Sequence, residues 1–209
     1  MTTATLPTLA DIRAAAERIG PHVRRTPTLP LRPTYDAPRG ELVVKLEGLQ
    51  HTGSFKPRGA FNRMLSLTPE ERARGVAAVS GGNHGLGVAY AAKALGTTAR
   101  LFLPVYASPS KQQKIRDLGA EIDLSEAIQE CFDKADAYVR ESGATFVHPY
   151  ADPLVLAGQG TVGLEFVEDG GDLDALVVAI GGGGLIGGLA IAASALRPGI
   201  RIYGVEPPG

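Results

Sequence analysis

Lys56 is the residue of this sequence whose surroundings favour covalent chemistry. It lies in residues 53–60, which read GSFKPRGA, among glycines, an aromatic residue and a proline. A lysine held in a partly apolar position has a lowered pKa, and its neutral amine can form a Schiff base with a carbonyl compound. Taken alone, however, the segment is better explained by an exposed lysine on a loop.

A second segment, residues 80–85 with the sequence SGGNHG, lies between an expected strand and an expected helix. Backbone N–H groups at a helix N-terminus bind carboxylates and phosphates. Asn83 could cap this helix, or its side chain could hydrogen-bond an oxygen of a cofactor. His84 by itself is more often structural than catalytic.

Four consecutive glycines followed by Leu185 form a third segment, again between a strand and a helix. Glycines let backbone amides close around a phosphate, and the helix dipole favours the anion. The segment also fits a dinucleotide fingerprint: Gly182, Gly184 and Gly187 match G-x-G-x-x-G, and Glu206 follows after about 20 residues. From this loop alone, a nicotinamide dinucleotide and the phosphate of a smaller cofactor are equally good ligands.

Together the three segments resemble the fold-type II enzymes that use pyridoxal phosphate (PLP), in the branch of threonine/serine dehydratases and serine racemases. The resemblance covers nearly the whole chain and matches order and spacing as well as residue type. It favours PLP over a dinucleotide, because a dinucleotide module explains neither Lys56 nor Asn83. The other matching segments are Asp11-Ile12, Lys45-Leu46-Glu47, His148-Pro149, residues 158–161 (GQGT) and residues 204–207 (GVEP).

The resemblance implies a role for each matching residue. Lys56 would bond covalently to PLP and act as the catalytic lysine, Phe55 would pack beside the cofactor ring, and Asn83 would hydrogen-bond its phenolic oxygen. The cofactor phosphate would be held by Gly181, Gly182, Gly183, Gly184 and Leu185. The substrate carboxylate would lie against the loop that contains Ser80, Gly81 and His84.

Gly81 narrows the expected reaction. In the racemase pattern this position is a serine that carries a proton on the opposite face of the cofactor, whereas glycine has no proton to give. The resemblance therefore implies elimination, in which Lys56 removes the Cα proton of L-serine or L-threonine and loss of water and ammonia leaves a 2-oxo acid. O-acetylserine sulfhydrylases are also similar, but their corresponding loops match less well.

The family pattern continues beyond Pro207, so we expect this chain to lack the C-terminal part of the large domain. That part also supplies most ligands of a divalent-cation site in the racemase-like branch. Glu206 matches one of these ligands and Asp174 a peripheral metal position, although a strand end and an exposed loop acid explain them equally well. The strand ending at Val205 would have an unprotected edge, which favours association, and we expect a homo-oligomer.

The elements that position these residues alternate regularly from residue 76 onward. Short apolar strands separated by helices predict parallel sheets covered on both faces. Helices are expected to begin after Thr8 and Thr68, and residues 21–40 to be irregular. The expected strands are 42–46, 76–80, 99–103, 121–124, 145–147, 176–180 and 200–205, and the later helices are 83–95, 110–118, 126–141, 160–168 and 185–196.

The resemblance thus implies an α/β protein of the tryptophan synthase β-like architecture, with two parallel αβα sheets and an incomplete large domain. We expect the large domain to comprise residues 1–68 and 149–209 and the small domain residues 69–148, with PLP between them. The rival hypothesis is a catalytically inactive PLP-binding fragment or structural partner. A nicotinamide dinucleotide-binding module is a more distant alternative.

Composition excludes several other classes. The chain has 21 Lys and Arg against 22 Asp and Glu, without a basic block, which argues against nucleic acid or an anionic membrane as partner. Residues 175–196 are uncharged and long enough to span a membrane, but the glycines favour a strand, a turn and a helix. Residues 1–7 do not resemble a signal peptide. The single cysteine, Cys131, is expected to be a small buried residue, and a reducing cytoplasm fits.

Overall fold

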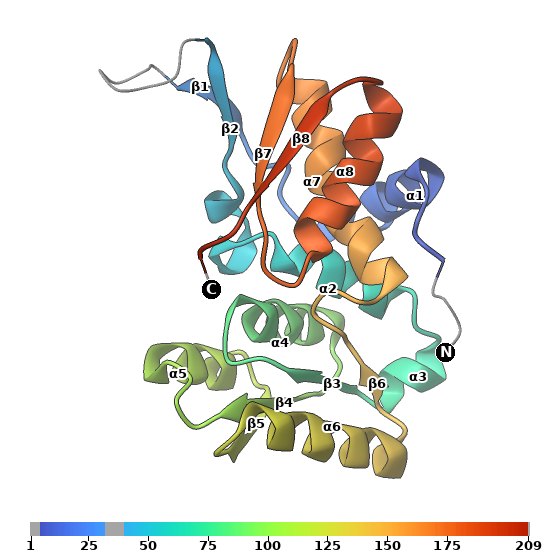
Figure 1. Cartoon of the computed structure of the whole chain (residues 1–209). Helices are drawn as coiled ribbons and strands as arrows, with labels where there is room; N and C mark the ends of the chain where they lie inside the picture. Colours follow the sequence, from blue (N-terminus) through green and yellow to red (C-terminus); the bar gives the residue numbers. More distant parts are fainter. Residues whose placement is uncertain (1–4, 32–39, 209) are drawn as a thin grey trace.

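The computed structural model describes residues 5–31 and 40–208. Its elements gather into two layered groups, which Figure 1 draws in the lower and upper halves of the view. The lower group extends along the chain from α3 (Pro69–Ala73) to β6 (Thr145–Phe146), and the upper group is built from both flanks of that segment. The domain boundaries that the sequence predicts, after residues 68 and 148, stay a prediction.

The lower group is a four-stranded sheet with helices on both faces. Its other elements are β3 (Val76–Val79), α4 (Asn83–Leu95), β4 (Ala99–Pro104), α5 (Pro109–Asp117), β5 (Glu121–Ser125) and α6 (Ile128–Ser142). The strand order is β5-β4-β3-β6, and every pair is parallel. Alternate β3 residues face opposite sides: Ala78 joins the core under α4 and α5, and Ala77 joins the core under α6. The predicted covered parallel sheet is confirmed.

The upper group surrounds a central helix. Its elements are α1 (Leu9–Ile19), β1 (Thr28–Leu31), β2 (Leu42–Lys45), α2 (Lys56–Leu65), α7 (Pro153–Asp169), β7 (Ala175–Ala179), α8 (Gly184–Leu196) and β8 (Arg201–Val205), with short 3-10 turns at Gly20–His22, Glu47–Leu49 and His51–Gly53. Helix α7 packs against α1, α2 and α8. Strands β7 and β8 pair in parallel, whereas β1 and β2 form an antiparallel pair. The glycine run lies in the loop between β7 and α8.

Several local predictions are confirmed. Thr8 and Thr68 each form a capping box, with Asp11 and Glu71 respectively. The uncharged stretch 175–196 divides into β7, the glycine turn and α8. No helix in the described part of the chain is long and apolar enough to cross a membrane. Cys131 is fully buried in α6.

Other local predictions are wrong. The sequence predicts irregular chain at residues 28–31, but they form β1, because a distant partner, β2, satisfies their backbone groups. The rest of that expected irregular segment, residues 32–39, lies outside the described residues. Helix α7 begins at Pro153, seven residues before the predicted start at 160: Asp152 caps it by accepting hydrogen bonds from the N–H groups of Leu154 and Val155.

Candidate active site

Lys56 is the first residue of α2, and its amine points into a cleft between the two groups of elements. Its Nζ donates a hydrogen bond of 2.9 Å to the carbonyl oxygen of Pro149. The same Nζ lies 5.2 Å from the centroid of the Phe55 ring. Burial lowers the pKa of the Lys56 amine, because an ammonium group loses hydration there. Lys56 is therefore a partly desolvated amine with Pro149 as its hydrogen-bond partner.

Close contact between helices determines where Lys56 lies. Helix α4 crosses the start of α2 at Gly87, where a Cβ would stand only 3.0 Å from the carbonyl carbon of Lys56. On the other side, α7 approaches through Gly158, where a Cβ would be 2.7 Å from the Cα of Gly59. Glycines at both crossings therefore let α4 and α7 pack closely against the first turn of α2.

A buried network of charged side chains also fixes the first turn of α2, through Arg58. The fully buried Arg58 guanidinium is bonded to both oxygens of Glu47 and both oxygens of Glu165, and it also donates to Thr161 Oγ1 and the Arg24 carbonyl. Lys45 adds a second cation, with its Nζ 2.6 Å from Glu165. The network joins β2, α2 and α7, and every N–H of Arg58 has a partner.

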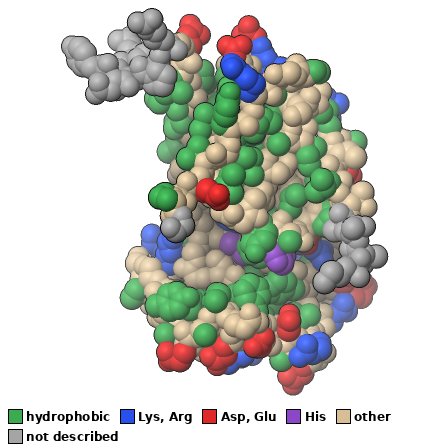
Figure 2. Space-filling view, viewed as in Figure 1, with side chains coloured by type: hydrophobic (Ala, Val, Ile, Leu, Met, Phe, Trp, Pro, Cys, Tyr) green, Lys and Arg blue, Asp and Glu red, His purple; other side chains and the backbone are tan. Residues whose placement is uncertain are grey.

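The cleft has a volume of about 570 Å³ and brings together most of the predicted site. Its walls come from the start of α2, the loops after β3, β4 and β7, the start of α6, and the segment before α7. In Figure 2, histidine side chains are visible in the hollow between the two halves of the molecule. The predicted site residues that line it are Lys56, Ser80, Gly81, Asn83, His84 and Gly182.

The asparagine loop is shaped by its own side chains. Ser80 Oγ accepts a hydrogen bond from the N–H of Gly82. Asn83 is the first residue of α4 and makes no capping hydrogen bond, so the capping explanation is wrong. Its Oδ1 instead accepts a 3.3 Å hydrogen bond from Lys111 Nζ on α5. Because the Asn83 side chain does not cap the helix, its amide lies at the wall of the cleft, where it could contact a ligand.

His84 is buried and neutral. Its Nε2 lies 2.9 Å from the carbonyl oxygen of Val147, to which an N–H at that position donates. Burial, together with the charges of Lys56 and His148, lowers the pKa of His84 to about 3, although the hydrogen bond to Val147 opposes this. His84 therefore lines the cleft as an uncharged ring that ties α4 to the end of β6, and its role toward a substrate stays a prediction.

The glycine run forms an open cradle at the N-terminus of α8. Gly183 has a φ of +82°, which favours glycine, and α8 begins at Gly184. A side chain at Gly182 would overlap the Tyr150 ring, whereas a Cβ at Gly181 or Gly183 would meet nothing within 4 Å. Free N–H groups at a helix N-terminus beside open space suit a phosphate group.

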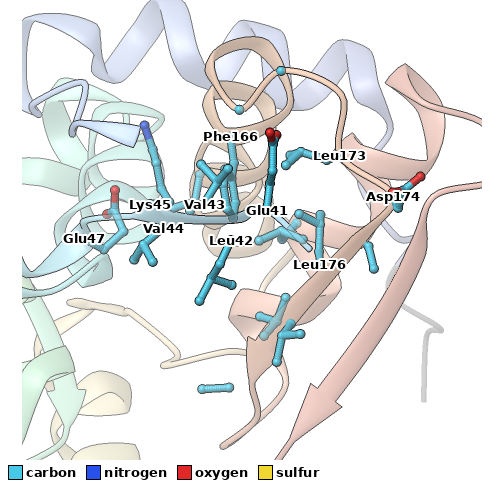
Figure 3. A pocket seen from close by; sticks show the side chains of 18 of the residues that line it. Glu41, Leu42, Val43, Val44, Lys45, Glu47, Phe166, Leu173, Asp174 and Leu176 are labelled. Atoms are coloured by element: carbon cyan, nitrogen blue, oxygen red, sulfur yellow. The ribbon is translucent and has the colours of Figure 1, made fainter. Parts of the chain in front are cut away.

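Two predicted cofactor contacts lie elsewhere. Phe55 and Leu185 line a second cavity of about 780 Å³ between β2, α7 and β7. Figure 3 shows that cavity, with apolar side chains such as Leu42, Phe166 and Leu176 around it. It contains neither Lys56 nor Asn83, so we assign the chemistry to the smaller cleft. The predicted contacts of Phe55 and Leu185 with a cofactor stay predictions.

The predicted metal ligands do not converge. Asp174 precedes β7 and Glu206 follows β8, and the register of the two strands places them at opposite ends of the pair, about 20 Å of strand apart. Among residues 5–31 and 40–208, no group of three or more His, Cys, Asp or Glu side chains could hold a metal ion. Metal binding at Glu206 stays a prediction.

Sequence reasoning missed several residues of the cleft, namely Tyr106, Ala107, Lys111, Ile128 and Tyr150. The signal that could have found most of them is topological. Loops after neighbouring parallel strands meet at one edge of a sheet, so the loop after β4 had to join the loop after β3. Tyr150 is adjacent to the His148-Pro149 pair that matches the family pattern.

Comparison with known sequences identifies the family. The model of the pyridoxal-phosphate dependent enzyme family matches residues 19–209. Over 200 residues the chain is 44% identical to an L-threonine ammonia-lyase of Thermotoga maritima, covering 95% of this chain and 50% of the relative. Over 209 residues it is 41% identical to a catabolic L-threonine dehydratase of Staphylococcus aureus, covering 98% of this chain and 60% of the relative. The chain thus spans about half the length of the curated relatives it matches.

Comparison with solved structures gives the same result. Maize serine racemase superposes with a TM-score of 0.94 at 38% identity, covering 97% of this chain and 62% of that chain. The T.th. threonine deaminase superposes with a TM-score of 0.90 at 42% identity, covering 96% of this chain and 65% of that chain. Lys56, the asparagine loop and the glycine cradle therefore lie in a known architecture, and the chain belongs to the fold-type II PLP-dependent enzymes, in the threonine dehydratase/serine racemase family.

Proposed function

We propose that this chain provides the lysine-bearing part of a PLP-dependent ammonia-lyase, which converts L-threonine or L-serine to a 2-oxo acid and ammonia. One observation carries the proposal: the buried amine of Lys56, the asparagine loop and Gly182 of the glycine cradle line one cleft. The two curated relatives, an L-threonine ammonia-lyase and an L-threonine dehydratase, support threonine as substrate. Because the chain spans about half of their length, the activity is proposed for the whole protein.

The cleft fits PLP, the cofactor of this family. The open cradle at Gly181 and Gly183 offers N–H groups for the phosphate, and Lys56 offers an amine for the covalent bond. Asn83 would hydrogen-bond the phenolic oxygen. When bound, PLP withdraws electrons from the Cα–H bond of an amino acid, which makes the Cα proton removable.

The residues of this chain would handle the proton and the charges. Lys56, with its pKa lowered by burial, takes the Cα proton on one face. The substrate carboxylate lies against Ser80 and Gly81, at the positive end of α4. The positive charge of Lys111, held beside Asn83, adds to the attraction for an anionic substrate. His84 is neutral and therefore adds no positive charge of its own to this attraction.

Gly81 supports elimination over racemisation. Racemisation needs a second proton carrier opposite Lys56, and Gly81 has none. A side chain at Gly81 would collide with the Cβ of Ala107, so the neighbouring loop also leaves no room for one. A proton removed by Lys56 is therefore returned from the same face or lost with the β-hydroxyl.

The test measures 2-oxo acid release by the whole protein from L-threonine, L-serine and D-serine after PLP is added, with chiral analysis of the remaining serine. We expect 2-oxo acid from the L-amino acids without formation of D-serine. Lys56→Ala should reduce the rate by about 10³-fold, because the proton acceptor is lost. Lys93→Ala, which removes an exposed lysine of α4, is the matched control and should retain the rate.

The rival proposal is a PLP-binding chain without catalysis, alone or as a structural partner. It predicts a visible absorption band of lysine-bound PLP that Lys56→Ala abolishes, together with no 2-oxo acid from any of the three substrates. That pair of results would replace the lyase proposal. D-serine formed from L-serine would instead favour a racemase and overturn the argument from Gly81.

A further inference from the structure

His148 organises the short turn that separates Lys56 from the glycine cradle. Its Nδ1 accepts two backbone hydrogen bonds, from the N–H of Tyr150 at 3.2 Å and from the N–H of Ala151 at 2.8 Å. The ring also packs edge-on against the Tyr150 ring, with centroids 4.7 Å apart. One side chain thus fixes the backbone of the three residues that follow it.

That turn touches both halves of the proposed cofactor site. The Pro149 carbonyl accepts the hydrogen bond from Lys56 Nζ. The Cα and Cβ of Tyr150 lie against Gly184, where a Cβ would be 3.1 and 3.0 Å from them, and the Tyr150 ring packs on Gly182. A shift of the turn would therefore move the acceptor of Lys56 and the wall of the cradle together.

We propose that His148 is a positioning residue, whose neutral imidazole holds the turn of residues 148–151 so that the Lys56 amine and the glycine cradle keep a fixed relation. The proposal rests on the proposed function of the cleft, which gives this relation its purpose. His148 itself does not line the cleft, so it acts through Pro149 and Tyr150.

Protonation of His148 would release the turn. An imidazolium carries hydrogen on both nitrogens, so Nδ1 could no longer accept from the two N–H groups. The titratable groups that face the ring are Lys56 of α2, His84 of α4, Tyr150 and Asp152, which caps α7 and is paired with Arg63. Burial, with the charge of Lys56, lowers the pKa of His148 although Asp152 opposes this. The acceptor form therefore persists at neutral pH.

Two substitutions distinguish the effect of the hydrogen-bond acceptor at residue 148 from the effect of the imidazole ring. In His148→Asn, the amide Oδ1 occupies nearly the position of Nδ1 and accepts hydrogen bonds at every pH. In His148→Ala, the acceptor is absent. If the hydrogen bonds position the turn, His148→Asn should behave like the wild type at neutral pH, and only His148→Ala should loosen the turn.

The experiment measures amide hydrogen exchange by NMR on the full chain without PLP. Protection of Tyr150 and Ala151 should fall about tenfold in His148→Ala, which is the net effect of one hydrogen bond, and should be retained in His148→Asn. Amides of Ala91 and Ala92, inside α4, should be unchanged and report that the fold is intact. After correction for intrinsic rates, acid should reduce the two protections in the wild type but not in His148→Asn.

A second readout follows Lys56 directly. The Cε resonance of Lys56 reports the pKa of its amine in the same PLP-free samples. We expect a downward shift of this pKa in His148→Ala, because the ammonium loses the Pro149 acceptor, and no shift in His148→Asn. The affinity for added PLP should fall by about tenfold in His148→Ala alone.

The proposal is overturned if Tyr150 and Ala151 keep their protection in His148→Ala, or if His148→Asn loosens the turn as much as His148→Ala does. A Lys56 pKa that is equal in all three proteins would also overturn it. Absence of PLP binding in the wild type would defeat the proposed function instead, since the exchange and pKa measurements need no cofactor.

Discussion

Burial governs the charges of single residues in the cleft. It lowers the pKa values of Lys56 and His84, which line the cleft, and of His148 beside it. The charge of Lys56 lowers the pKa values of both histidines further. His84 shows the effect most strongly, because the folded protein holds it with only 3% of its surface exposed. The cleft that we propose for an anionic substrate thus has a basic amine beside a neutral imidazole.

This burial predicts a stability that decreases in mild acid. The pKa of His84 is about 6.5 when unfolded and about 3 when folded, so between these values the unfolded state binds more protons. Folding stability should therefore rise with pH in this window, and His84 should contribute roughly 1.4 kcal/mol per pH unit below 6.5. Urea unfolding at about pH 5.0, 5.5, 6.0 and 6.5 measures how the free energy of unfolding depends on pH.

His84→Gln is the matched variant for this prediction, because its amide can donate to the Val147 carbonyl without titrating. It should show a flatter dependence of unfolding free energy on pH. Some slope should remain, since burial also lowers the pKa values of His51 and His148. Equal slopes in the two proteins would mean that His84 titrates normally.

The sequence is informative about residues where a motif repeats a known spacing. Lys56, Asn83 and the glycine run can be predicted in this way, and the structure places Lys56, Asn83 and Gly182 on one cleft. Lys111 and Tyr150 cannot, because each is an ordinary residue until the loops after neighbouring strands meet. The resemblance predicts Phe55 beside a cofactor ring, and this stays a prediction: Phe55 packs with Val162 and lines the other cavity, while its ring centroid lies 5.2 Å from Lys56 Nζ.

At the scale of elements, the buried Arg58 network is what attaches α2 to β2 and α7. A buried ion pair adds little net stability, but removing one partner leaves an unpaired buried charge. Arg58→Met should therefore destabilise the protein by about 3 to 5 kcal/mol, because Glu47 and Glu165 lose their cation. Urea unfolding measures this loss.

Arg25→Met is the control for the network prediction. Arg25 also pairs with two carboxylates, Glu168 and Asp169, but its side chain is 52% exposed. Its loss should cost less than about 1 kcal/mol. Similar losses in the two variants would show that the burial of Arg58 has no special effect.

The same helix α2 is the main element that sequence reasoning missed. Its first residues contain proline and glycine, which usually indicate a loop. Pro57 is tolerated because it lies in the first turn, where its absent N–H would have no helical partner. Gly59 is needed for the contact with α7, a long-range reason that a local pattern does not contain. Strand β1 was missed for the same kind of reason.

At the scale of the whole molecule, the β7–β8 pair presents an apolar face. Val177 and Tyr203 are register partners and are 70% and 50% exposed, and Val205 is also exposed. Among the described residues, β7 and β8 pair only with each other, and an apolar face on such a strand pair favours association with another chain. The homo-oligomer that the sequence predicts stays a prediction, and this face is its candidate contact.

Lysines on this face should therefore reduce self-association. Sedimentation at increasing concentration should show a lower average mass for Val177→Lys combined with Tyr203→Lys than for the wild type, since two buried ammonium groups would oppose the contact. Leu6→Lys changes an equally exposed apolar residue elsewhere and should leave the mass unchanged. An unchanged mass in the double variant would exclude this face as the contact.

Chemical reduction of the bound cofactor tests directly whether Lys56 carries PLP. PLP is added to the full chain, the covalent bond is reduced with borohydride, and the modified lysines are identified by peptide mass spectrometry. We predict modification at Lys56 at stoichiometric PLP, while the exposed Lys93 and the cleft residue Lys111 stay unmodified. Modification spread over surface lysines, or concentrated at Lys111 with Lys56 free, would show that Lys56 does not carry the cofactor.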